Sequence, residues 1–329
     1  MSYVLGVDGG NTKTIALVAR LDGTIAGVGR GRCGDIYSKY YGVDGAIAEI
    51  ARAVREALAA AQAEPEDVLI GAFSMAGADW PEDFALLERE MCRLGFGQRI
   101  IVVNDALGAL RAGTTNGAGV SVVCGTGCAI GARAADGRIW HTSFWQEPGG
   151  ADQLGQKTLR AVYRAELRID PPTTLSARVL EFFGLSDVES VLHHLTARGD
   201  GPQEDISQLA RVLLGEADGG DATARRIVQE HGAALGDYTL AAARRVGIER
   251  TPFTLVLAGG VLRHPTPLLR EALIARIRSV APDVQPSISR FEPAVGALLL
   301  ALEAAHIAID EPLRAHLAAT LPPAAFFVT

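Results

Sequence analysis

One unit, two strands joined by a glycine turn and followed by a third strand, occurs twice in the sequence. The first copy spans Val4–Val28 and the second spans Ser121–His141, and in each an Asp-Gly pair separates the second strand from the third. Similar units at matched spacing are typical of an internal duplication. The sequence therefore predicts two domains, each of which begins with a three-stranded β-meander.

The turn of the first copy has the composition of a phosphate-binding loop. It follows an apolar strand that ends at Asp8. The residues of the turn are Gly9, Gly10, Asn11, Thr12 and Lys13. Glycine lets the backbone pass close to an anion where a Cβ atom would block it, and successive amides can then bind phosphate oxygens. A carboxylate at the strand end suits a hydrated divalent cation. The turn is not a Walker A loop, since Thr12 stands where that loop needs glycine.

The second copy carries a turn of the same kind, formed by Gly125, Thr126 and Gly127. Glycine turns are common in ordinary hairpins, so one of them alone would be weak evidence. Two at the same place in duplicated units favour a pair of hairpins that bind one polyphosphate from opposite sides. A duplicated scaffold with inert turns is the alternative.

Composition describes an ordinary globular protein and excludes several classes. The 329 residues are 48% hydrophobic, and the net charge is −7 with scattered basic residues, which argues against nucleic acid as a main partner. No apolar run reaches the length that crosses a membrane. The four cysteines show no paired spacing, which favours free thiols, and the first strand starts too early to leave a charged leader. We therefore expect a cytoplasmic protein.

Helices and strands alternate between and after the two meanders. Apolar residues at helical spacing cover 45–63, a helix begins near 80, and buried strands are predicted at 68–73 and 99–103. Residues 151–250 are mostly helical. A strand at 253–258 and helices at 267–280 and from 293 onward follow. The pattern βββαβα is thus present twice. We predict an α/β fold with two domains, 1–112 and 113–329, the second carrying a helical insertion at about 151–250.

Parallel sheets flanked by helices bind ligands at the carboxyl ends of their strands. Five residues lie at predicted strand ends of this kind: Asp8, Ser74, Asp105, Gly125 and Gly259. The sequence thus predicts that chemistry-bearing residues from both halves of the chain gather at one edge of each sheet.

Several segments together resemble the BadF/BadG/BcrA/BcrD ATPase family, which includes N-acetylglucosamine kinase, within the actin–hexokinase–Hsp70 superfamily. The segments that carry the resemblance are 6–14 (GVDGGNTKT), 76–79 (AGAD), 104–106 (NDA), 125–127 (GTG), 257–261 (LAGGV) and 293–297 (PAVGA). The resemblance implies two actin-like, ribonuclease H-like domains with ATP and substrate in the cleft between them. It also implies a kinase that transfers the γ-phosphate of ATP, as a magnesium complex, to a hydroxyl of an amino sugar.

Matching positions imply roles for particular residues. Residues 9–13 and 125–127 are similar to the two phosphate loops, and Gly259, Gly260 and Val261 to the adenosine motif, with Asp8 near the metal. Asp105 matches the general base, which would take the proton of the acceptor hydroxyl. A helix N-cap is the structural alternative for Asp105. The residues implied at the sugar are Asp35, Ser74, Ala76, Gly77, Asn104, Asp105, Glu147, Gly149 and Gly150.

Two departures from the family pattern fall in the sugar half of the cleft. Asp35 is the nearest match to an asparagine of the sugar kinases. Glu147 and Pro148 stand at the Asp and Glu of their Gly-Asp-Glu-Gly segment. Two extra carboxylates would favour a cationic sugar such as glucosamine over its acetylated form. The alternatives are that Asp35 caps a turn and that Glu147 is solvated.

Two other functions stay open within the same family and fold. An ATPase activator of an acyl-CoA dehydratase would carry a cysteine in an Asp-Lys-Cys-Ala-Ala-Gly-Thr-Gly-like motif, which this sequence lacks. A sugar-responsive regulator would ordinarily add a DNA-binding domain, for which there is no room before Val4. The sequence leaves the oligomeric state open, with a homodimer as one candidate.

Overall fold

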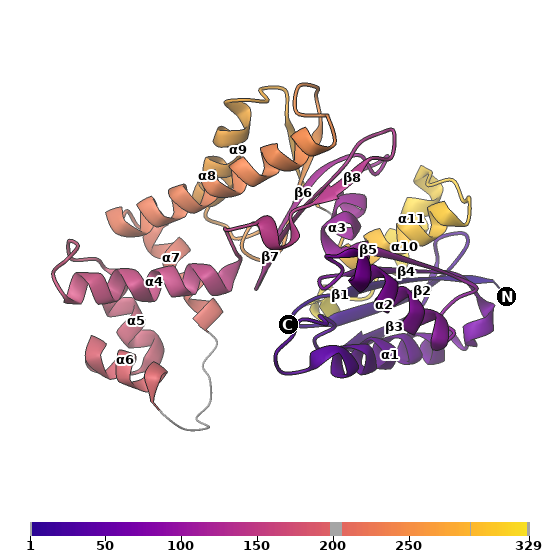
Figure 1. Cartoon of the computed structure of the whole chain (residues 1–329), viewed down its shortest axis with the longest axis horizontal. Helices are drawn as coiled ribbons and strands as arrows, with labels where there is room; N and C mark the ends of the chain where they lie inside the picture. The colour runs from indigo at the N-terminus through magenta and orange to yellow at the C-terminus, as the bar shows by residue number, and fades with distance from the viewer. Residues whose placement is uncertain (1, 198–205, 290, 328–329) are drawn as a thin grey trace.

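Two five-stranded sheets, one from each half of the repeat, form the framework of the computed structural model (Figure 1). The structure describes residues 2–197, 206–289 and 291–327. The first sheet has the order β3-β2-β1-β4-β5 and the second the order β10-β9-β6-β7-β8. In each, two antiparallel pairs form the meander and two parallel pairs follow. The predicted α/β fold with a duplicated βββαβα order is therefore confirmed.

The strands of the first sheet are β1 (Tyr3–Gly9), β2 (Thr14–Arg20), β3 (Ile25–Gly31), β4 (Val68–Met75) and β5 (Arg99–Asn104). Those of the second are β6 (Gly119–Cys124), β7 (Cys128–Arg133), β8 (Ile139–His141), β9 (Thr254–Ala258) and β10 (Gln285–Ile288). The sequence pattern did not predict β10. Its four residues include Pro286 and two polar side chains, and proline is tolerated because this strand lies at the edge of the sheet.

Three helices follow the first meander: α1 (Gly42–Ala61), α2 (Pro81–Arg93) and α3 (Asp105–Gly113). Helix α1 buries one apolar stripe, which includes Ile50 and Val54, against the first sheet. Helix α3 begins at the carboxyl end of β5 and contacts β6, β7 and β9 of the second sheet as well as β4 and β5 of the first. It is therefore the helix through which the two sheets are packed together.

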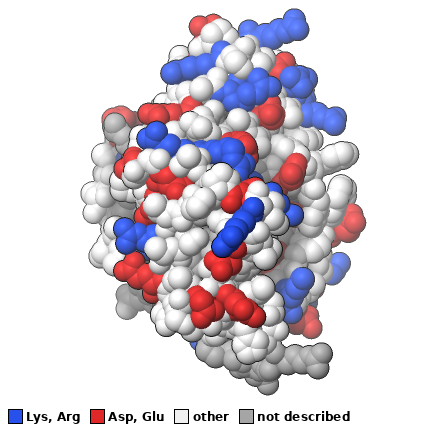
Figure 2. Space-filling view, turned by 90° about the vertical axis from the view of Figure 1, so that its left-hand side faces the viewer, with Lys and Arg blue, Asp and Glu red and all other residues white. Residues whose placement is uncertain are grey.

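Between β8 and β9 the chain is helical. The helices there are α4 (Ala151–Glu166), α5 (Leu175–Phe183), α6 (Val188–Thr196), α7 (Leu209–Asp218) and α8 (Ala222–Arg245). Figure 1 shows α4 to α7 extending away from the first sheet, on the left of the view. Figure 2 shows the face on that side, where acidic and basic side chains are interspersed. In the part of the chain that the structure describes, no helix is long and apolar enough to cross a membrane.

The C-terminal helices return to the first sheet. After α9 (Leu268–Arg278), helices α10 (Pro293–Ala304) and α11 (Glu311–Thr320) and the short helix η4 (Ala324–Phe327) bury apolar side chains against β1, β2 and β4. Helix α10 also crosses α3 at close range: a Cβ atom on Gly296 would lie 1.8 Å from the Gly108 carbonyl oxygen. The predicted second domain, 113–329, thus includes a segment that packs on the first sheet. Apolar spacing predicts a buried face but does not specify which sheet covers it.

Candidate active site

The two glycine turns, which lie more than 100 residues apart in sequence, meet in the structure. The Thr12 and Thr126 hydroxyl oxygens are 3.1 Å apart, and the Asn11 side-chain Nδ2 atom lies 3.0 Å from the point where a Cβ atom on Gly127 would stand. Backbone hydrogen bonds close each turn, from Gly10 N to Lys13 O in the first and from Gly125 N to Gly127 O in the second. The turns of the two meanders therefore face each other across a narrow gap.

Asp8 is buried at the carboxyl end of β1, directly before the first turn. Burial, and after it the charge of Asp105, raises its pKa to about 7. No group of three or more His, Cys, Asp or Glu side chains in the described ranges is arranged to hold a metal ion. A cation at Asp8 would therefore take its other ligands from phosphate oxygens and water, which suits Mg²⁺.

Lys13 ends the first turn and contacts a segment that no sequence pattern connects to it. Its ammonium donates a hydrogen bond to the backbone carbonyl of Phe327 in η4, and the neighbouring Phe326 carbonyl accepts from Arg30. Burial lowers the pKa of Lys13, and Glu292 and Asp8 oppose that change. The short helix η4 thus fixes the direction of the lysine that ends the first glycine turn.

Asp105 is the first residue of α3, and Asn104 caps the helix. The Asn104 side-chain oxygen accepts from Ala106 N at 3.1 Å, so capping does not account for the Asp105 carboxylate. The Oδ1 atom of Asp105 is buried and has no hydrogen-bond partner among the described residues. Burial, and after it the charge of Asp79, raises the pKa of Asp105 to about 7. An unpaired buried acceptor with a near-neutral pKa is suited to take a proton from a ligand.

Hydrogen bonds from Ser74 and Asn104 support the segment that carries Asp105. Ser74 is fully buried and donates its hydroxyl to the Asp105 backbone carbonyl at 3.3 Å, so it positions the start of α3. Asn104 donates to Asp79 Oδ1 and to the Ala78 carbonyl, both at 3.1 Å. These contacts join the end of β5 to the segment after β4.

The segment after β4 also contacts the loop that carries Asp35. Ala76 N donates to the Gly9 carbonyl at 2.8 Å, next to the first turn. A Cβ atom on Gly77 would lie 2.7 Å from Asp35 Oδ1, so only glycine leaves room for that carboxylate. Asp35 Oδ1 accepts from Tyr37 N at 2.9 Å, as a turn cap does, and burial raises its pKa. Asp35 therefore lies beside Gly77, half-buried at the wall of the site.

On the side of the second domain, Gly150 lies against the second turn, since a Cβ atom on it would be 2.1 Å from the Gly127 carbonyl oxygen, and Glu147 is exposed. Ala151 N donates to the Gly125 carbonyl at 2.8 Å, which places the start of α4 under that turn. The Gly149 carbonyl accepts from His231 Nε2 at 3.1 Å, and Lys157 contacts His231 Nδ1 at 3.0 Å. Burial, and after it Lys157, lowers the pKa of His231 to about 4, so its ring is neutral. His231 lies within α8, and no sequence motif indicated a role for it.

The predicted adenosine segment follows β9 and is joined to the second turn through β6. Val261 N donates to the Cys124 carbonyl at 3.0 Å. Gly259 has φ +90°, and a Cβ atom on it would lie 2.3 Å from the Cys124 carbonyl oxygen. Gly260 is exposed, and no described atom lies within 4 Å of its Cβ position, which leaves an open backbone face. An ion pair between Arg263 and Glu292, 2.6 Å long, connects this segment to the start of α10.

The two domains also touch through an aromatic contact that the sequence did not predict. Phe144, in the short helix η2 (Ser143–Trp145) after β8, stacks on Trp80 with ring centroids 6.0 Å apart. It also meets the Tyr37 ring in a T-shaped contact, with ring centroids 5.2 Å apart. Both partners belong to the first domain. The structure therefore holds the domains together at this aromatic contact as well as at the two glycine turns.

Comparison with known proteins places this site in context. The BadF/BadG/BcrA/BcrD ATPase family model matches residues 5–301. The N-acetylmuramic acid/N-acetylglucosamine kinase of Clostridium acetobutylicum is 28% identical over 269 residues, which cover 80% of this chain and 87% of that protein. The N-acetyl-D-glucosamine kinase of Dictyostelium discoideum is 25% identical over 312 residues, which cover 91% and 97%.

Among solved structures, a provisionally named N-acetylglucosamine kinase from Chromobacterium violaceum is similar, with a TM-score of 0.69 and 21% identity. The match covers 91% of this chain and 99% of that chain. At this identity the likeness establishes the fold.

Proposed function

This chain belongs to the BadF/BadG/BcrA/BcrD ATPase family, and we propose that it is a kinase that transfers the γ-phosphate of ATP to a hydroxyl of an amino sugar. The acceptor would be of the N-acetylglucosamine or glucosamine type. The observation that carries the proposal is Asp105, whose buried Oδ1 atom has no hydrogen-bond partner in the described part of the chain and lies in the same site as two facing glycine turns. The relatives from Clostridium acetobutylicum and Dictyostelium discoideum are both named as kinases of amino sugars, which supports the same substrate class.

ATP would bind between the domains. The amides of residues 9–13 and 125–127 would bind the phosphates, and the open backbone at Gly260 would take the nucleoside. Asp8 would be the protein ligand of Mg²⁺, with phosphate oxygens and water as its other ligands. The bound ion would neutralise charge on the phosphates. The raised pKa of Asp8 fits this assignment, because a cation beside the carboxylate restores its ionised form.

Asp105 would act as the general base. Phosphoryl transfer asks mainly for positioning and charge neutralisation, so one carboxylate within reach of the acceptor hydroxyl suffices to take its proton. Ser74 and Asn104 fix the start of α3, and with it the direction of that carboxylate. Closure of the two domains would keep water from accepting the phosphate.

Asp35, Ala76, Gly77, Gly149 and Gly150 would border the sugar, with Ser74 and Asn104 behind them and Glu147 at the exposed rim. Asp35 and Glu147 would favour a free amine over an acetamide, whereas the names of the relatives point to acetylated substrates. Both forms belong to the proposed substrate class. A competition assay between glucosamine and N-acetylglucosamine would measure which of the two the protein prefers.

ADP release with ATP-Mg and a panel of hexoses, amino sugars and N-acetylated sugars tests the proposal. We expect release to be stimulated strongly by one or more amino sugars and weakly by glucose. ATP turnover that no sugar alters would contradict the proposal and favour an ATPase activator. Sugar binding without turnover would also contradict it, and would favour a regulator.

A further inference from the structure

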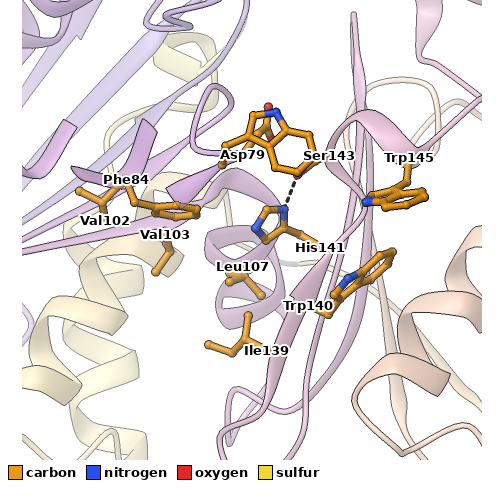
Figure 3. A pocket seen from close by; sticks show the side chains of 11 residues that line it. Asp79, Phe84, Val102, Val103, Leu107, Ile139, Trp140, His141, Ser143 and Trp145 are labelled. Carbon is orange, nitrogen blue, oxygen red and sulfur yellow. Dashed lines mark hydrogen bonds between the residues drawn. The ribbon is translucent and has the colours of Figure 1, made fainter. Parts of the chain in front are cut away.

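A cavity of about 330 Å³ lies between the domains, beside the proposed acceptor site. The first domain contributes Asp79, Trp80 and Phe84 to its wall, and the second contributes the end of β8 and η2. In Figure 3, Phe84 lies on one side of the cavity and Trp140 and Trp145 lie on the other, with the His141 ring between them. None of the residues with a role in the proposed phosphoryl transfer lines it.

All three tryptophans of the chain line this cavity: Trp80, Trp140 and Trp145. Trp80 is 40% exposed and Trp145 is 64% exposed, so neither serves mainly to fill a core. Exposed aromatic rings gathered around one cavity mark a binding surface. A pyranose ring presents apolar C–H faces that stack on such rings, and its hydroxyls need polar partners at the edge.

Polar groups of the required kind are present. Asp79 accepts hydrogen bonds from Asn104 and from the Ser143 hydroxyl, and its pKa is raised to about 6 by burial. His141 Nδ1 lies 2.6 Å from the Ser143 hydroxyl, and burial lowers the pKa of His141, so its ring is neutral near pH 7. Asp79, His141 and Ser143 thus supply acceptors and donors on one side of an otherwise apolar cavity, as is typical of small-molecule sites.

Asp79 also connects the cavity to the reacting group. Asn104 donates to Asp79 and is followed directly by Asp105, and the charge of Asp79 is the strongest charge effect on Asp105. A ligand whose hydroxyl lies at Asp105 would therefore have its neighbouring substituent directed toward Asp79 and the tryptophans. The volume of the cavity, about 330 Å³, exceeds what an ammonium group needs. It falls near the lower end of the range of roughly 300–1,000 Å³ found for small-molecule pockets.

We propose that this cavity is a subsite for a second pyranose ring, so that the kinase accepts an amino-sugar disaccharide. The inference rests on the proposed function, because it extends the same acceptor site by one ring. The transfer itself is unchanged: the acceptor oxygen forms a bond to the γ-phosphorus, the bond to ADP breaks, and the proton goes to Asp105.

Intrinsic fluorescence tests the proposal directly, since every tryptophan lies in the cavity. The protein is titrated with N-acetylglucosamine and with N,N′-diacetylchitobiose, and ADP release is measured with both. We expect the disaccharide to change tryptophan emission and to bind about tenfold more tightly than the monosaccharide. Trp145→Ala should lower kcat/KM for the disaccharide about tenfold more than for the monosaccharide. Leu167→Ala, which removes an exposed apolar side chain outside the cavity, should leave that ratio unchanged.

The outcomes separate the subsite from the proposed function. If the monosaccharide is phosphorylated but the disaccharide neither changes emission nor releases ADP, the subsite is overturned and the kinase assignment stands. An equal loss for both sugars in Trp145→Ala also overturns it. If no sugar is phosphorylated while the disaccharide still titrates the tryptophan emission, the kinase assignment fails and the subsite stands.

Discussion

Asp105→Asn is expected to abolish sugar phosphorylation while making the protein more stable at alkaline pH. The structure sets both effects, because the carboxylate is buried and its Oδ1 atom has no partner among the described residues. Asparagine keeps the shape of the protonated acid but cannot take a proton. A general base contributes on the order of 10²–10⁴ in rate, so turnover should fall at least a hundredfold. Nucleotide should still bind, because neither glycine turn is altered.

The raised pKa of Asp105 gives the sign and range of the pH effects. With a pKa of about 7 in the folded protein, roughly half of the molecules carry the ionised base at pH 7 and about a tenth at pH 6. The kcat/KM of the wild-type protein should therefore rise with pH up to about 8. Because Asp8 and Asp105 interact, the midpoint belongs to the pair of carboxylates.

The same pKa implies an opposite trend in stability. Between pH 3.8, the ordinary pKa of aspartate, and about 7, the folded state holds a proton that the unfolded state has released. The free energy of unfolding therefore falls as the pH rises through that window. The rise from 3.8 to about 7 corresponds to at most about 4 kcal/mol, which asparagine would in part restore at pH 8.

Thermal unfolding at pH 5 and pH 8, together with steady-state ADP release, measures both effects. We expect Asp105→Asn to raise the Tm at pH 8 and to raise it less at pH 5. Asp283→Asn, at an exposed position, is the matched control and should change neither turnover nor Tm. A variant that keeps more than about a tenth of wild-type turnover would remove Asp105 from the role of base. A lower Tm at pH 8 would show that the buried carboxylate is satisfied in solution.

Three further predictions concern the nucleotide, domain closure and the core. Gly260→Val should weaken ATP-Mg binding at least tenfold by calorimetry without lowering the Tm, because its Cβ position is open. Gly127→Val should also weaken ATP-Mg binding, because its side chain would push against Asn11. Normal ATP-Mg binding by both folded variants would contradict the two-turn site. Sugar and a non-hydrolysable ATP analogue should each tighten the other's binding by the same factor, worth roughly 1–3 kcal/mol, and equal affinities with and without saturating sugar would indicate a rigid cleft. Arg111→Met should lower the free energy of unfolding, measured in urea, by about 3 kcal/mol, because among the described residues it leaves Glu303 paired only with Arg133 at 3.8 Å. The matched control is Arg276→Met, which removes the exposed ion pair with Asp237 and should lower the free energy of unfolding by under about 1 kcal/mol.

Local pattern was sufficient to predict most of the fold. The glycine turns, the meanders and the strands at 68–73 and 99–103 follow from apolar runs bounded by turn residues, and the structure has them within about three residues. Helix α11 was not predicted, because its apolar residues did not indicate a helix. Signals for its start are nevertheless present in the sequence, since Asp310 caps it and Pro312 lies in its first turn. The packing of α10 on the first sheet depends on the close approach of Gly296 and Gly108, which no local pattern specifies.

The candidate site was predictable where it lies at strand ends and not where distant segments meet. Asp8, Asp105 and the turns follow directly from the carboxyl-end rule. The contact of Lys13 with Phe327 joins residues 314 positions apart, and His231 reaches Gly149 from the middle of a long helix. The three tryptophans are equally remote from the motifs, because α2, β5 and the end of β8 converge only when the two domains dock.

The contacts between the domains explain why closure and chemistry would be coupled in this fold. Among the described residues, several contacts cross between the two parts of the site: Thr12 with Thr126 at the glycine turns, Phe144 with Trp80 and Tyr37 near the cavity, and Arg263 with Glu292 at the start of α10, which packs on the first sheet. Each is small or partly exposed, so each contributes modestly alone. The contact between α3 and α10 is more extensive and is buried. A ligand that touches both domains would add its binding energy to these weak contacts, whereas one that touches a single domain would leave the balance between open and closed states unchanged.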